Sequence, residues 1–220
     1  MNKEWAELNK AMQLHLKKKD EFAEGIATLL KLRHELMKQM IVFKKQLKVE
    51  DFNAMPYRNA KGYHSKTIAY SLWHIFRIED IVAHTLIADD EQVFFKGHYQ
   101  RKINSPIITT ANELTGEDII SFSEKLCVDE LYAYIEAVDL ASTEILESLT
   151  YSDIKLKITD KKRKALENLS VVSNDENACW LIDYWCSKDI KGLIQMPFSR
   201  HWIMHVEACI RIMDKLLSVR

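Results

Sequence analysis

Apolar side chains recur at steps of three and four residues along four long stretches of the chain. This spacing places them on one side of a helix, as in helices that pack together in a bundle. The predicted long helices cover residues 20–48, 65–88, 129–149 and 197–218. Four long helices with two long connections predict an all-α fold, a four-helix bundle with at least one crossover.

Shorter helices are expected around these four, over residues 3–17, 117–125, 160–169 and 176–187. The segments 50–66, 89–116 and 150–195 are predicted to be connections, and the last two are long. Connections of this length are unusual in a compact bundle and are often functional. The chain shows no internal repeat and no domain boundary, so we predict one domain over residues 1–220.

The composition agrees with a helical, globular chain and argues against several classes of protein. Only 5 of the 220 residues are glycine and 3 are proline, so turn-forming residues are scarce. The 31 basic and 32 acidic residues nearly balance, which argues against a nucleic-acid-binding protein. No apolar stretch reaches the roughly 20 residues of a membrane span, and the amino terminus lacks the apolar core of a signal peptide. Four cysteines without CxxC spacing predict reduced thiols and a cytoplasmic protein.

Two histidines interrupt the apolar stripe of the last helix and are the first candidates for chemistry. His201 and His205 occupy a stripe that Phe198, Ala208 and Ile212 continue. Residues four apart project from the same side of a helix, about 6 Å apart along its axis. Two neutral imidazoles at this spacing can hold one divalent ion such as zinc, nickel or iron. The alternative is that each is a hydrogen-bonded histidine of the core.

Other polar or aromatic residues in the helices receive plainer interpretations. His74 lies on a second face of helix 65–88, and it can join the site only if that helix contacts the last one. Arg33 and Glu79 also interrupt apolar stripes, and we interpret them as a paired charge in the core rather than as catalytic groups. The remaining histidines are expected on the surface: His15, His34, His64, His84 and His98. Four tryptophans are expected to pack in the core: Trp73, Trp180, Trp185 and Trp202.

Two segments of the chain carry a family resemblance. They are TIAYSLWHIFRIED (67–80) and GLIQMPFSRHWIMHVEA (192–208). The first resembles the second-helix segment, and the second the last-helix segment, of the DinB/YfiT-like family. The resemblance implies a four-helix bundle, commonly dimeric, in which His74, His201 and His205 bind a divalent metal. Some members of that family are transferases or isomerases that use low-molecular-weight thiols.

This resemblance leads to a functional prediction. Three neutral histidines leave positions on a divalent ion, zinc or nickel, open to water or substrate. A thiol bound there loses its proton and becomes a nucleophile, so we predict a metal-dependent thiol S-transferase that acts on a small electrophile. Arg33, Arg77 and Arg200 are the candidates to hold an anionic group of the thiol or substrate. A metal-dependent hydrolase and a non-catalytic, stress-related metal-binding protein are the alternatives.

Apolar residues on more than one face of the second and of the last long helix predict a homodimer. On the last helix the second face lies beside the histidines and carries Ile203, Val206, Ile210, Met213 and Leu217. A single chain most easily buries one face of a helix, so a second apolar face suggests a partner chain. The alternative is that helices of the same chain, over residues 3–17 and 160–187, cover this face.

Overall fold

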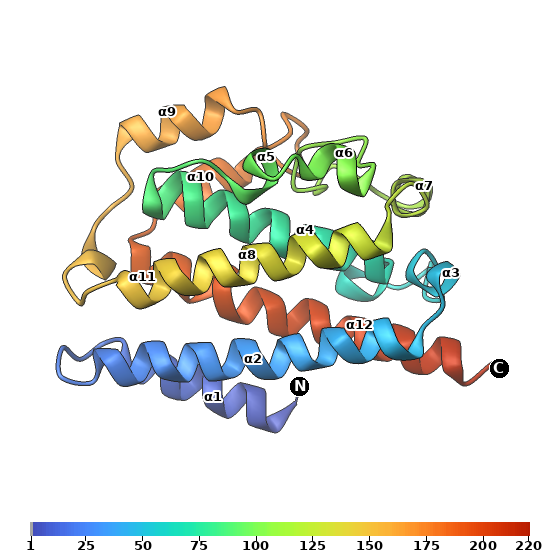
Figure 1. Cartoon of the computed structure of the whole chain (residues 1–220), viewed down its shortest axis with the longest axis horizontal. Coiled ribbons are helices and arrows are strands. Elements are labelled where there is room, and N and C mark those ends of the chain that lie inside the picture. Colours follow the sequence, from blue (N-terminus) through green and yellow to red (C-terminus); the bar gives the residue numbers. More distant parts are fainter. Residues whose placement is uncertain (1) are drawn as a thin grey trace.

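Four long helices lie side by side along the molecule (Figure 1). In the computed structural model, which describes residues 2–220, they are α2 (Phe22–Gln46), α4 (Ile68–Asp80), α8 (Val128–Ser148) and α12 (His201–Leu217). A π-helical segment, η2 (Ile81–Ala88), continues α4, and another, η4 (Met196–Arg200), leads into α12. The four stretches predicted from apolar spacing are thus confirmed as helices. Their π-helical parts could not be predicted, because a local change of helical pitch leaves the apolar spacing nearly unchanged.

Shorter helices surround these four. α1 (Lys3–His15) packs along α2, and three others lie where short helices were predicted: α7 (Glu117–Ser123), α9 (Asp160–Asn168) and α10 (Trp180–Cys186). The connections also contain α3 (Val49–Phe52), η1 (Gly62–His64), α5 (Val93–Lys96), α6 (Tyr99–Ile103), η3 (Asp153–Lys155) and α11 (Ile190–Ile194). Residues 2–220 form no strand, only an isolated bridge between Lys157 and Asp189, so the described chain is all-α. None of the helices in this range is both long and apolar enough to cross a membrane.

Helix α4 runs through the interior. Every residue from Ile68 to Asp80 is buried, as expected of a helix with apolar residues on two faces. Both α8 and α12 contact it. Its N-terminus is capped by Thr67, whose hydroxyl accepts a 3.0 Å hydrogen bond from the backbone N–H of Tyr70. Polar side chains on α4 therefore face the core, where each needs a partner or a ligand.

The buried guanidinium of Arg33 joins its own helix, α2, to the other three long helices. Arg33 of α2 donates two hydrogen bonds of 2.8 Å to Glu79 of α4 and one of 2.6 Å to Asp139 of α8. Its Cζ lies 4.3 Å from the ring centre of Trp202 on α12. Burial by itself lowers the pKa of Arg33, but the two carboxylates raise it above the ordinary value, so the group stays charged. The predicted paired core charge of Arg33 and Glu79 is confirmed.

The second apolar face of α12 is covered within the chain. Ile203, Val206 and Met213 are buried, and Ile210 and Leu217 are partly buried against the same core. Helix α2 packs against α12. The apolar residues on which the homodimer prediction depended are therefore accounted for without a partner chain.

Candidate metal centre

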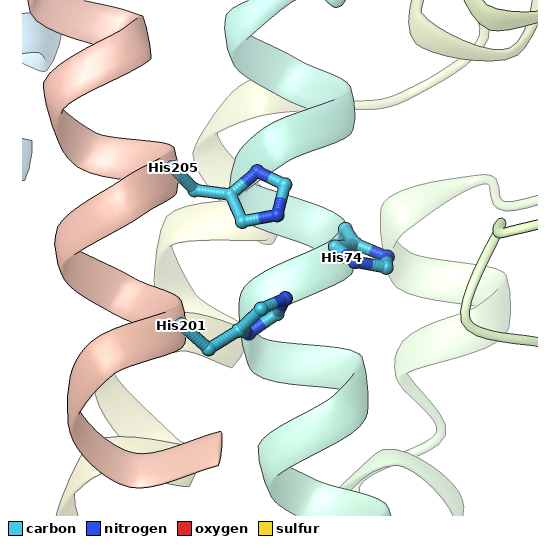
Figure 2. A group of neighbouring side chains, drawn as sticks. All are labelled: His74, His201 and His205. Atoms are coloured by element: carbon cyan, nitrogen blue, oxygen red, sulfur yellow. The ribbon is translucent and has the colours of Figure 1, made fainter. Parts of the chain in front are cut away.

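Three histidines from two helices meet in the interior. His74 lies in the middle of α4, and His201 and His205 lie in the first two turns of α12. Figure 2 shows the three imidazoles gathered in the space between these helices. The ring centre of His74 is 4.9 Å from that of His201 and 4.9 Å from that of His205, and the latter two are 4.6 Å apart. Helix 65–88 thus contacts the last helix, which is the condition for His74 to join the site.

The nitrogen atoms of these rings suit a single divalent ion. One nitrogen from each ring lies within 4.8 Å of the other two. Zinc binds imidazole nitrogen at about 2.0–2.1 Å, so two ligands of one zinc ion are at most about 4.2 Å apart. The nitrogens must therefore move somewhat closer together to share one zinc ion. Within residues 2–220, no group hydrogen-bonds to Nδ1 of His201 or to either ring nitrogen of His205, and buried nitrogens without partners are unfavourable unless a ligand satisfies them.

Burial keeps the three imidazoles neutral, which is the form that binds metal. It lowers the pKa of His74 to about 4, because the charged ring is poorly solvated there. Burial likewise holds the pKa of His201 and of His205 well below the ordinary value, and the neighbouring histidines lower both further. At neutral pH all three rings therefore offer a lone pair without first losing a proton.

A loop of the first long connection holds the side chains of α4 in place. Four successive carbonyls accept hydrogen bonds from α4: Ile108 from Arg77 (2.9 Å), Thr109 from Trp73 (3.1 Å), Thr110 from His74 (2.7 Å) and Ala111 from Tyr70 (3.0 Å). Because a carbonyl only accepts, Nδ1 of His74 carries the proton and Nε2 is the nitrogen left for a ligand. Backbone carbonyls orient many metal-binding histidines in this way. Ala111 has a φ of 65°, a left-handed conformation that is uncommon outside glycine.

The three histidines line a cavity of about 480 Å³. Both long connections supply its walls: Asn112 comes from the first, and residues of α10, including Trp180 and Tyr184, come from the second. Tyr63 of η1 also lines it, with its ring centre 4.7 Å from that of His205. Tyr63 is 39% exposed and Trp180 is 48% exposed, so the cavity reaches the surface and small molecules can approach the histidines.

The arginines proposed to hold an anionic group do not line this cavity. Arg33 and Arg77 instead bond to groups of the core. Arg200 is exposed and does not line the cavity, although its charge acts on Tyr63 of the cavity wall. The cation that lines the cavity is Lys66, just before α4. Lys66 was not predicted from the sequence, because it belongs to no helical stripe and nothing in its local sequence distinguishes it from a surface lysine.

Trp180 was wrongly predicted to pack in the core, since it lies half-exposed at the cavity. Trp180 and Trp185 lie on different sides of the short helix α10, so only one of them can face inward, and that one is Trp185. The ring of Trp180 packs edge to face on Tyr184, with 5.7 Å between ring centres. The predicted burial of Trp73, Trp185 and Trp202 is confirmed.

His84 was wrongly predicted to lie on the surface, since it is buried. Its Nδ1 is 2.6 Å from Asp90 Oδ1, and its Nε2 is 3.9 Å from Asp80 Oδ1. The chain after η2 folds back over this face, where the Asp80 carboxylate accepts hydrogen bonds of 2.9 Å from the backbone N–H groups of Val93 and Phe94. Apolar periodicity cannot show that a loop will cover a polar helix face. The other four histidines expected on the surface are exposed or partly exposed.

Comparisons with protein-family models and with curated proteins give no match for this chain. The site is therefore interpreted from its own residues. Three buried histidines lie close enough to hold a metal ion, beside a cavity with one lysine and several aromatic side chains. This arrangement can bring a divalent ion and small organic molecules together.

Proposed function

We propose that the chain is a divalent-metal-binding protein of the DinB/YfiT-like four-helix-bundle type that acts as a metal-dependent thiol S-transferase. The observation that carries the proposal is that neutral histidine nitrogens without partners line a cavity open to small molecules. One histidine on the second long helix and two, four residues apart, on the last agree with the resemblance of residues 67–80 and 192–208. Zinc and nickel are the proposed ions, because both bind neutral imidazole well.

The cavity favours a catalytic site over a structural one. Structural zinc sites are closed by four protein ligands, whereas catalytic sites use three and leave a position for substrate. Among residues 2–220, the group that could hold a metal ion consists of His74, His201 and His205. A site with three ligands next to a cavity is suited to binding a substrate directly.

The residues of the chain would hold and shield the reactants. His74, His201 and His205 would hold a divalent ion, whose Lewis acidity would favour the deprotonated form of a thiol at this site. Tyr63 packs on His205 from the surface side, and Trp180 and Tyr184 provide apolar walls that limit access of water. In the transfer, the thiol sulfur bonds to an electrophilic carbon, the leaving group departs with its electron pair, and the thiol proton passes to solvent.

The lining of the cavity favours a thiol over water as the nucleophile. Metalloproteases with the HExxH motif use a glutamate as the general base for water. No carboxylate of residues 2–220 lines this cavity, so no such base lies beside the histidines. A thiol loses its proton more readily than water does without a general base, because its ordinary pKa is about 8.5 whereas that of bulk water is about 15.7.

The proposal is tested by a conjugation assay. Protein loaded with zinc or nickel is mixed with a panel of low-molecular-weight thiols and a chromogenic aryl halide, and product formation is followed. Turnover should require both metal and thiol, and it should be absent from metal-stripped protein and from His201→Ala. His84→Ala is the matched control, because it removes a buried histidine outside the site and should retain activity.

Two other results would replace the proposal. Metal-dependent hydrolysis of esters or amides without thiol would support the alternative of a hydrolase. Tight metal binding with neither activity would support the alternative of a non-catalytic metal-binding protein.

A homodimer is not needed for this function. All three histidines come from one chain, and the apolar face of α12 on which the dimer prediction depended is covered in that chain. Sedimentation of the purified protein tests the dimer separately.

A further inference from the structure

Lys66 is a partly buried cation without an anionic partner. It lines the cavity of the three histidines, and no carboxylate of residues 2–220 lines that cavity or raises the pKa of Lys66. Burial lowers the pKa of its ammonium group, and no acidic group offsets this effect. A cation withdrawn from water without a counter-charge is unfavourable, and an anionic ligand would remove that penalty.

Lys66 lies close to one of the three histidines. It precedes the N-cap of α4, Tyr70 and His74 lie one turn apart on that helix, and all three side chains line the cavity. The Lys66 ammonium lies 4.7 Å from the centre of the Tyr70 ring. The Tyr70 ring in turn stacks on His74, with 5.5 Å between ring centres and 12° between ring planes. These two contacts place the Lys66 ammonium within about 10 Å of the His74 ring centre, a distance that a small organic molecule can span.

A second polar group of the cavity also lacks a partner. The buried Oδ1 of Asn112 receives no hydrogen bond from any group in residues 2–220, and Asn112 lines the same cavity. Buried amide oxygens are normally hydrogen-bonded. Asn112 can therefore accept a hydrogen bond from the N–H or O–H group of a ligand, or donate one if its amide is turned. The other exposed walls are largely aromatic and carry no negative charge.

We propose that Lys66 forms a carboxylate subsite in the cavity of the histidines and that Asn112 binds an N–H or O–H group of the same ligand, so that the thiol taken by this site carries a carboxylate group. The inference rests on the proposed function, in which the sulfur of that thiol is placed at the histidines. The carboxylate pairs with the Lys66 ammonium, Asn112 bonds to a neighbouring polar group, and the chain between sulfur and carboxylate lies along Tyr70. Lys66 is then a residue that determines which thiol is used.

The test compares two series of thiols by binding rather than by turnover. Protein loaded with cobalt(II), whose absorption spectrum changes when a thiolate binds, is titrated with ω-mercaptoalkanoic acids of increasing chain length and with the matching ω-mercaptoalkan-1-ols. At the length that spans from the histidines to Lys66, the acid should bind about tenfold more tightly than the alcohol, as expected for one charge-assisted contact weakened by partial exposure. Shorter and longer acids should show a smaller preference.

Variants assign this preference to Lys66. Lys66→Met and Lys66→Gln should bind cobalt normally and bind acid and alcohol equally, whereas Lys66→Arg should retain part of the preference. Lys61→Met is the matched control, because it removes an exposed lysine of the same loop that does not line the cavity, and it should behave like the unaltered protein.

The outcomes separate the inference from the function on which it rests. Equal binding of acids and alcohols by the unaltered protein would overturn the carboxylate subsite and leave the thiol function standing. A preference that survives in both Lys66→Met and Lys66→Gln would overturn the role of Lys66. Absence of any spectral change with either series would overturn thiol binding itself, and the subsite with it.

Discussion

Two polar clusters are buried among the same long helices, and they differ in how far their polar atoms are satisfied. In one, the two terminal nitrogens of the Arg33 guanidinium are held by Glu79 and Asp139 at 2.6–2.8 Å, and only Nε lacks a partner in residues 2–220. In the other, His201 and His205 have ring nitrogens without a partner in residues 2–220. The arginine cluster contacts all four long helices, whereas the histidines face a cavity. Polar groups that complete one another stabilise a fold, and polar groups that are left incomplete beside a cavity indicate a ligand site.

The difference between the clusters predicts that breaking the arginine cluster causes the largest loss of stability. Arg33→Met leaves the buried Glu79 carboxylate without its partner, and breaking a buried ion pair in this way lowers the free energy of unfolding by about 3–5 kcal/mol. Urea denaturation measures the loss. The double variant Arg33→Met with Glu79→Leu should recover much of it, because no buried charge is then left unpaired. A loss below about 1 kcal/mol for Arg33→Met would mean that the cluster does not hold the helices together.

Metal binding at the histidine cluster should instead raise the free energy of unfolding of the protein. Zinc or nickel at about 1,000 times its dissociation constant should raise the free energy of unfolding by about 4 kcal/mol, because it binds only the folded protein. Denaturation with and without metal measures this gain. His205→Ala should fold without metal, since it removes nitrogens that have no partner, and it should show little or no gain when metal is added. An equal gain in His205→Ala would place the metal elsewhere.

Removing one hydrogen bond of the loop that holds His74 should have a smaller effect, and it should lower both the free energy of unfolding and the metal affinity. Tyr70→Phe removes the 3.0 Å hydrogen bond to the Ala111 carbonyl, which should lower the free energy of unfolding by about 1 kcal/mol. Metal affinity should fall up to about tenfold, because the same loop orients His74. Calorimetric titration measures the affinity.

Tyr132→Phe is the matched control for this change. It removes a buried hydrogen bond of 2.8 Å to the Met40 carbonyl away from the site. It should lower stability by a similar amount and leave metal affinity unchanged. Equal metal affinity for Tyr70→Phe and Tyr132→Phe would show that the loop does not support the site.

The helices and the candidate histidines of the last helix could be identified from the sequence for one physical reason. Both follow from spacing along a helix, which local sequence contains: His201 and His205 stood out because they interrupted an apolar stripe, as did Arg33 and Glu79. All four are buried in the structure. His74 could join the site only if its helix contacted the last helix, and the sequence alone did not show whether the two helices touch.

The residues that were missed or misplaced belong to connections. Lys66, Asn112 and Trp180 reach the cavity because segments far apart in the sequence fold over α4 and α12. His84 is buried because the chain after η2 folds back over it. Such contacts depend on the path of loops in space, and neither apolar spacing nor composition encodes that path.

The measurement that tests the central claim most directly is the metal content of the purified protein and two variants. Each protein is stripped of metal, dialysed against zinc or nickel and analysed for bound metal per chain. The account predicts one ion per chain for the unaltered protein and for His84→Ala, and almost none for His201→Ala, with helical content preserved in all three. One ion per chain in His201→Ala, or none in the unaltered protein, would contradict the assignment of the metal to His74, His201 and His205.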